Sequence, residues 1–226
     1  MTKVWYLRNI DVFRGLSDEE VRMIDGHSLI QQIRRGQAIY LQGSPARYVY
    51  ILKKGVVKIN WLTSHGKEII LDIIKGGSIF GAMVLAEPNE MNESAEAIED
   101  GLICAMKAED FERLIQKMPT LSRRVTRMIG SRRYRVENKL IDLLFRTVEQ
   151  RFAKTLLSLV DDFGIPHDDG FLLKIRLTHK DYAALIASTR ETITATVNSL
   201  KSKGLIGIED KYVVIRSLDG VRAIAG

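Results

Sequence analysis

Residues 177–215, LTHKDYAALIASTRETITATVNSLKSKGLIGIEDKYVVI, decide the fold of the C-terminal part of this chain. Thr178 stands directly before a short segment, HKDYAALIA, whose apolar residues recur at helical spacing. One face of that helix would carry Tyr182, Leu185 and Ile186. The pattern predicts a short helix that ends in a turn at residues 187–188.

A second helix is expected directly after this turn. Ser188 or Thr189 can cap it by accepting hydrogen bonds from its free backbone N–H groups, and Gly204 is suited to end it. Its core-facing side chains would be Ile193, Val197 and Leu200. Two short strands then flank Glu209-Asp210-Lys211, which predicts a hairpin wing after the second helix.

The start of the second helix carries Arg190 and Glu191, two residue types that read base edges in the major groove of DNA. Many small helical hairpins share the apolar pattern alone. A hairpin followed by a wing, with an Arg-Glu pair at the start of its second helix, is more specific. We therefore interpret the segment as a winged helix-turn-helix that recognises DNA.

The segments TRETIT (189–194) and NSLKSKGLI (198–206) resemble the recognition helix of the Crp/Fnr family of bacterial transcription regulators. The resemblance extends along nearly the whole chain. It implies an α+β protein with a β jelly-roll sensor domain (residues 1–118), a long central dimerisation helix (119–146) and a winged helix-turn-helix domain (147–226). It also implies a homodimer that binds a palindromic promoter site in double-stranded DNA.

Composition and length fit a cytoplasmic protein with one large or two small domains. The chain has 226 residues, of which 46% are hydrophobic, and no apolar run approaches the ~20 residues that span a bilayer. The N-terminal segment WYLRNIDVF (5–13) is too short and too charged for a signal peptide. The single cysteine, Cys104, excludes an internal disulfide and an all-cysteine iron–sulfur cluster.

The net charge of +6 does not mark the DNA-binding domain. Residues 1–118 hold 15 basic and 16 acidic side chains, and residues 147–226 hold 11 and 10. Residues 119–146 hold 8 basic and 2 acidic side chains, so the excess lies in the central segment. The DNA-binding argument therefore depends on the motif and not on the isoelectric point.

From residue 30 to residue 106, short strand-like stretches alternate with glycine-containing turns at roughly ten-residue spacing, which favours a β sandwich or jelly roll. Residues 108–145 then read as helix, broken once at Pro119. An apolar stripe beyond that proline predicts a parallel homodimer seam, although part of it can pack on the β-roll. The stripe consists of Leu121, Val125, Met128, Val136, Leu140 and Leu143, with Arg132 at one further position.

The resemblance places a hinge near 145–147 and an effector pocket in the β-roll. In relatives that bind cyclic AMP, a Phe-Gly-Glu turn holds the ribose and an Arg-Ser pair holds the cyclic phosphate. Here these positions are Gly81-Ala82 after Phe80, and Glu93-Ser94. The two adenine-binding helix positions of those relatives align with Val136 and Glu137.

A carboxylate in place of the phosphate-binding arginine would repel a cyclic phosphate, so we expect no cyclic nucleotide binding in the usual mode. Relatives that sense 2-oxoglutarate also use a cation near residue 93, so Glu93 argues against that effector too. Two interpretations stay open. Glu93 pairs with Arg132 or Arg133 and closes the pocket, or Glu93 and Glu137 select a neutral or cationic effector that the sequence does not identify.

The sequence gives little support for metal binding, redox chemistry or catalysis. The four histidines lack metal-ligand spacing, and no cofactor is expected, although a haem-sensing branch of the family makes His65 a minor candidate. Cys104 reads as a small buried hydrophobe. No catalytic constellation or nucleotide-binding loop is recognisable, so the chain should bind and switch rather than catalyse.

By resemblance, Arg190 would donate to a guanine and Glu191 would accept from a cytosine. Phosphate contacts are expected from Thr178, Lys180, Thr189 and Thr192, with Ser188 beside them in the turn. Crp-type proteins read a further guanine with an arginine where this chain has Ala195, so the half-site should match theirs only in part.

Two further expectations follow from the resemblance. The loop 161–170 lies where Crp-type activators touch RNA polymerase, which suggests an activator, although no residue pattern separates activator from repressor. The competing interpretation is a small-molecule or haem sensor whose C-terminal domain acts mainly through protein contacts. A gel shift without sequence-selective retardation would favour it.

Overall fold

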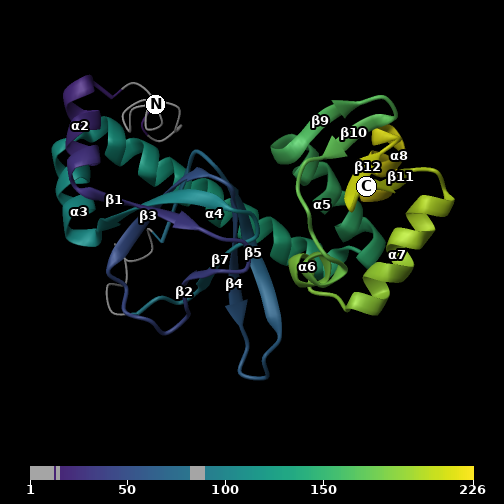
Figure 1. The fold of residues 1–226 in the computed structure, drawn as a ribbon. Coiled ribbons are helices and arrows are strands. Elements are labelled where there is room, and N and C mark those ends of the chain that lie inside the picture. The colour runs from purple at the N-terminus through teal and green to yellow at the C-terminus, as the bar shows by residue number, and fades with distance from the viewer. Residues whose placement is uncertain (1–12, 14–15, 82–89) are drawn as a thin grey trace. The chain divides into compact units, whose positions relative to one another are not determined.

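The computed structural model describes residues 13, 16–81 and 90–226. It divides into two compact units, Met1–Tyr134 and Arg135–Gly226, and the boundary between them falls inside the long helix α4 (Pro119–Phe145). Figure 1 shows the elements of both units.

The first unit contains two four-stranded antiparallel sheets, which agrees with the predicted β-roll. One sheet has the order β1-β8-β3-β6 and the other the order β2-β7-β4-β5. Their bounds are β1 (Ser28–Ile33), β2 (Ala38–Tyr40), β3 (Tyr48–Lys54), β4 (Val56–Leu62), β5 (Glu68–Lys75), β6 (Ser78–Phe80), β7 (Ser94–Ala97) and β8 (Gly101–Lys107).

The β-roll core forms because side chains from both sheets point inward and exclude water. Among them are Ile51, Ile59, Phe80 and Ile103, all at most 1% exposed. Cys104 is a free, buried cysteine in the same cluster, as the sequence indicated.

Helices α2, α3 and α4 accompany the sheets. Helix α2 (Asp18–Gly26) begins with a capping box between Ser17 and Glu20. Helix α3 (Ala108–Lys117) ends at Met118, and α4 begins at Pro119, so the predicted break at the proline is confirmed. Proline fits the first turn of a helix because it needs no N–H there.

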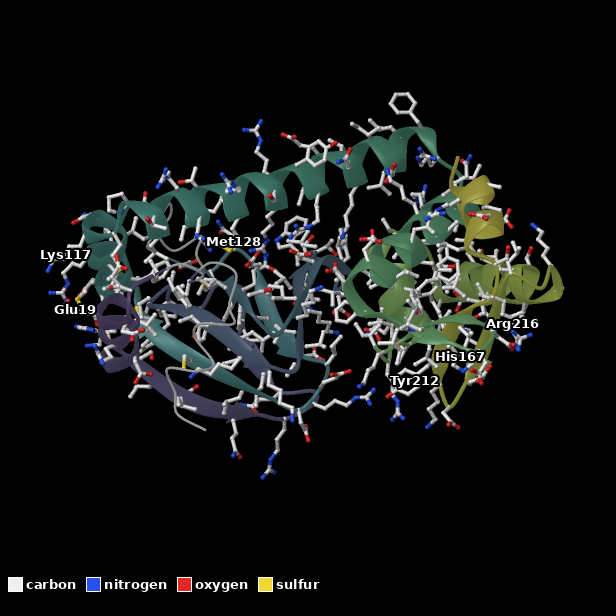
Figure 2. All side chains as sticks on the ribbon, turned by 90° about the horizontal axis from the view of Figure 1, so that it is seen from above. Glu19, Lys117, Met128, His167, Tyr212 and Arg216 are labelled. Atoms are coloured by element: carbon white, nitrogen blue, oxygen red, sulfur yellow. The ribbon has the colours of Figure 1, made fainter. Side chains whose placement is uncertain are left out.

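The predicted seam on α4 is partly wrong. Leu121 and Val125 are 0% and 3% exposed within the single chain, and Met128 packs against the same core (Figure 2), so these residues belong to the β-roll. Further along, Val136, Leu140 and Leu143 are each more than two-fifths exposed. The stripe is therefore not one continuous surface available to a partner.

The second unit is a small helical domain with a four-stranded antiparallel sheet of order β11-β12-β10-β9. Its elements are α5 (Val148–Phe163), β9 (Gly164–His167), β10 (Gly170–Leu173), α6 (His179–Leu185), α7 (Arg190–Ser202), β11 (Ile206–Glu209), β12 (Tyr212–Ile215) and α8 (Leu218–Ala225). Thr147 caps α5 with a capping box, so the chain changes helices within residues 145–148, where the hinge was predicted.

The predicted surface loop 161–170 is wrong in its secondary structure. Residues 161–163 end α5, and β9 pairs with β10 through partners such as Pro166 and Phe171. β9 is the edge strand of the sheet, where the missing N–H of Pro166 costs no ladder hydrogen bond. A short acidic hairpin turn therefore replaces the loop.

No helix within the described residues is long and apolar enough to cross a membrane.

Candidate nucleic-acid interface and sensor-domain site

Helix α6 begins at a tightly held N-terminus. The Thr178 hydroxyl accepts from the Asp181 backbone N–H at 3.1 Å, and the Thr178 backbone N–H donates to the Asp181 carboxylate at 2.8 Å. This reciprocal capping box fixes the direction in which the chain enters the helix. Thr178 and Lys180 are both exposed there, which leaves them on the surface where phosphate contacts were predicted.

The turn between α6 and α7 uses a left-handed residue. Ala187 has φ 51°, and the Ser188 N–H donates to the Ala183 carbonyl at 2.9 Å. Thr189 caps α7, because its hydroxyl accepts from the Thr192 N–H at 3.2 Å. Of the two caps that the sequence left open, the structure uses Thr189.

Helix α7 has one buried and one exposed face. Ile193, Val197 and Leu200 are buried, as predicted. Arg190 and Glu191 are exposed, and within the described residues neither side chain has a hydrogen-bond or ion-pair partner. The two side chains therefore do not neutralise each other, and both are free to bind a ligand.

One hydrogen bond between the two helices was missed by the sequence analysis. His179 Nδ1 lies 2.8 Å from the Thr194 hydroxyl, which also donates to the Arg190 carbonyl at 2.9 Å. The start of α6 is thereby tied to the first turn of α7. No local pattern pointed to it, since fifteen residues separate the two partners.

The wing is a two-residue hairpin. Asp210 and Lys211 have φ 47° and 71°, so both occupy the left-handed region that a type I′ turn requires. Beside the turn, His167 Nε2 lies 3.3 Å from Glu209, and the Arg176 guanidinium lies 4.7 Å from the centre of the Tyr212 ring. Figure 2 shows His167, Tyr212 and Arg216 gathered around this sheet.

A second polar site lies in the first unit. Arg132 Nη2 lies 3.1 Å from Glu93 Oε2, and the Tyr40 hydroxyl donates to Glu93 Oε1 at 3.0 Å. Asp72 lies 3.8 Å from Arg132 Nε on the same guanidinium. Glu93 is 8% exposed, so its charge is compensated by Arg132 and Tyr40 and hardly by solvent.

The environment of Tyr40 follows from this arrangement. Burial raises the pKa of the Tyr40 phenol above its ordinary value, and the neighbouring Glu93 carboxylate raises it further. The phenol therefore stays protonated and keeps donating to the carboxylate. Its ring stacks against Tyr50 at a centroid distance of 5.4 Å, which fixes the phenol in place.

The other predicted pocket residues lie in different surroundings. Gly81 has φ 72°, and a Cβ there would lie 3.1 Å from the Tyr50 ring, so a larger residue does not fit. Ser94 is buried and its hydroxyl accepts from the Gln42 N–H at 2.9 Å. Arg133 is exposed, Val136 and Glu137 are exposed residues of the second unit, and Ala82 lies outside the described residues.

Of the two arginines considered as partners for Glu93, the structure uses Arg132. The sequence analysis did not anticipate Tyr40 and Asp72, which lie 53 and 21 positions from Glu93 in the chain. Within the described ranges, no group of three or more His, Cys, Asp or Glu side chains is arranged to hold a metal ion.

A β-roll domain followed by a helix-turn-helix domain defines a class of transcription regulators that bind DNA. Residues 30–118 match the cyclic nucleotide-binding domain family, and residues 150–224 match the Crp-like helix-turn-helix domain family. The chain belongs to the Crp/Fnr family of transcription regulators.

Similar proteins support this assignment along most of the chain. A global nitrogen regulator from Nostoc sp. is 30% identical over 189 residues, which is 83% of this chain and 85% of that protein. A cyclic AMP receptor protein from Thermus thermophilus is 29% identical and covers 97% and 98% of the two chains. The crystal structure of a CRP-family transcriptional regulator from the same species superposes with a TM-score of 0.74 at 26% identity, covering 87% and 96%. These relatives are regulators and not enzymes.

Proposed function

We propose that this chain acts as a homodimer that binds a palindromic DNA site, with Arg190 and Glu191 reading bases in each half-site. The single observation that supports this most is the free pair of side chains at the capped N-terminus of α7. Both are exposed and have no partner among the described residues, so no contact within the protein has to break before they bind bases. We expect a cytoplasmic location, because the proposed target is promoter DNA.

Each of the two residues has a defined base preference. A guanidinium can donate two hydrogen bonds to O6 and N7 of guanine, and a carboxylate accepts from N4 of cytosine. The exposed Thr178, Lys180 and Thr189, together with the half-exposed Ser188 and Thr192, would contact phosphates and set the register. A two-fold dimer would place half-sites about 10–11 base pairs apart.

The dimer seam is proposed on a revised set of α4 residues. Ile129, Val136, Leu140 and Leu143 are all at least 40% exposed, and with Arg133 they follow steps of four, three, four and three residues. That spacing is the repeat of a two-stranded coiled coil. The seam would thus begin at Ile129, beyond Leu121 and Val125 in the chain, which the β-roll covers.

The effector pocket is proposed to be closed by the protein itself. Arg132 and Tyr40 both contact the Glu93 carboxylate. Residue 93, which would meet a cyclic phosphate, therefore carries a negative charge that the protein already compensates. Although similar proteins include a cyclic AMP receptor protein, we expect cyclic AMP neither to bind tightly nor to increase DNA affinity. Calorimetry that found a micromolar dissociation constant would refute this.

Contact with RNA polymerase, and hence activation, is a further part of the proposal. The segment from the end of α5 to the start of β10 carries Asp161, Asp162, Asp168 and Asp169 on the surface, at the place that the family resemblance assigns to this contact. Transcription in vitro from a selected promoter, with and without the protein, would distinguish activator from repressor.

The deciding experiment is selection of bound sequences from random duplex DNA, followed by binding isotherms on the selected site and on scrambled duplex. Arg190→Ala should cost ~1–3 kcal/mol on the selected site and relax the preference for one guanine. Lys180→Ala is the matched control, because loss of a phosphate contact should weaken all sequences alike. If Arg190→Ala lowered the affinities for the selected site and for scrambled duplex by the same factor, Arg190 would contact a phosphate and not a base. If the parent selected no site, the C-terminal domain would act by another route, such as protein binding.

A further inference from the structure

The exposed face of α7 extends beyond Arg190 and Glu191. Ala195 and Asn198 are also exposed, four and seven residues after Glu191, so the three side chains form one stripe along the helix. Thr194 lies between them but is engaged by His179 and by the Arg190 carbonyl. Glu191, Ala195 and Asn198 therefore form the face of α7 opposite to the buried one.

This spacing suits the reading of several base pairs. A homeodomain places its base-reading side chains at the same intervals of three, four and seven residues along its recognition helix. Glu191 and Asn198 are separated by about 10 Å along the helix axis at 1.5 Å per residue. Since base pairs rise by about 3.4 Å, Asn198 would reach a base pair about three steps from the one that Glu191 reads.

The amide of Asn198 has no evident role in the fold. It is exposed, lies in the helix interior where asparagine is not favoured, and has no hydrogen-bond partner within the described part of the chain. Its neighbour Ala195 is small, so no long side chain stands between Asn198 and a groove that α7 enters. The amide is therefore available to a ligand on the same face as Glu191.

We propose that Asn198 is a further specificity-determining residue, which reads an adenine through its side-chain amide. An asparagine amide donates to N7 and accepts from N6 of adenine, a pattern that no other base presents in the major groove. The methyl group of Ala195 would face the base pair between, where a thymine methyl gives an apolar contact. This inference rests on the proposed function, because it requires α7 to enter the major groove.

The test compares selected DNA sites for the parent, Glu191→Ala and Asn198→Ala. The position that loses its preference in Glu191→Ala marks the base pair read by Glu191. The proposal expects an A·T pair about three steps away in the parent site, and a loss of that preference alone in Asn198→Ala. Affinity for the parent site should fall about 5- to 100-fold, while affinity for a site with that A·T pair replaced should be unchanged.

Ser202→Ala is the matched control, since Ser202 is exposed on the same stripe one turn further on and should change no base preference. If Asn198→Ala selected the parent site unchanged, or weakened every duplex by one factor, the assignment of Asn198 would be wrong while DNA recognition by Arg190 and Glu191 stood. If the parent selected no sequence at all, the proposed function itself would fail, and this inference with it.

Discussion

Replacement of Arg132 by leucine tests the closed β-roll site most directly. The substitution keeps a helix-forming side chain on α4 but removes the cation that lies 3.1 Å from Glu93. Glu93 is 8% exposed, and the remaining partner of its carboxylate is the Tyr40 hydroxyl. The variant therefore holds a buried carboxylate charge without its counter-charge.

The magnitude follows from the cost of an unpaired buried charge. Removing one partner of a buried ion pair costs about 3–5 kcal/mol. Because the Arg132 side chain is itself one-fifth exposed, solvent weakens the pair, and we expect a loss of about 2–4 kcal/mol.

Urea unfolding followed by tryptophan fluorescence measures this loss of stability in the first compact unit. Both tryptophans, Trp5 and Trp61, lie within residues 1–134. Arg127→Leu is the matched control on the exposed side of α4 and should change stability by less than about 0.5 kcal/mol. Adding Glu93→Gln should recover part of the loss. An Arg132→Leu variant that loses no more stability than Arg127→Leu would refute the role of Arg132 as the counter-charge of Glu93.

Three further predictions concern other parts of the molecule. Burial raises the pKa of Tyr40, so the neutral phenol stabilises the folded state fully below pH 10, and this stabilisation is lost as the pH rises above 10. In alkaline unfolding, Tyr40→Phe should therefore reduce the fall of the free energy of unfolding by up to about 1.4 kcal/mol per pH unit. An unchanged slope would contradict this. Leu140→Asp should place two charges in the proposed seam and give a monomer by sedimentation at micromolar concentration, whereas a dimer would move the seam elsewhere. Ala195→Arg should add a guanine preference of about 1–3 kcal/mol at one further position in binding isotherms, and an unchanged preference would mean that α7 docks differently.

Local rules were sufficient for the helix-turn-helix. Thr178 and Asp181 stand three residues apart, and Thr189, Gly204 and the turn at Asp210 follow preferences that act within one turn of chain. The sequence therefore predicted the helices, their caps and the wing without knowledge of the rest of the fold. The β9 strand was not predicted. It contains Pro166, which is tolerated because β9 lies at the sheet edge, and a strand's place in a sheet is not a local property.

The sequence by itself determined that α4 carries apolar residues at steps of three and four, because that periodicity is a property of neighbouring positions. Only the tertiary structure decided which of these positions are covered: Leu121, Val125 and Arg132 pack on the β-roll, and Ile129, Val136 and Leu140 remain exposed. It also brought Tyr40, Glu93 and Arg132 together across 53 and 39 positions of the chain. Contacts between residues so far apart in the chain depend on how the two sheets pack together, and the spacing of residues along the sequence does not predict that packing.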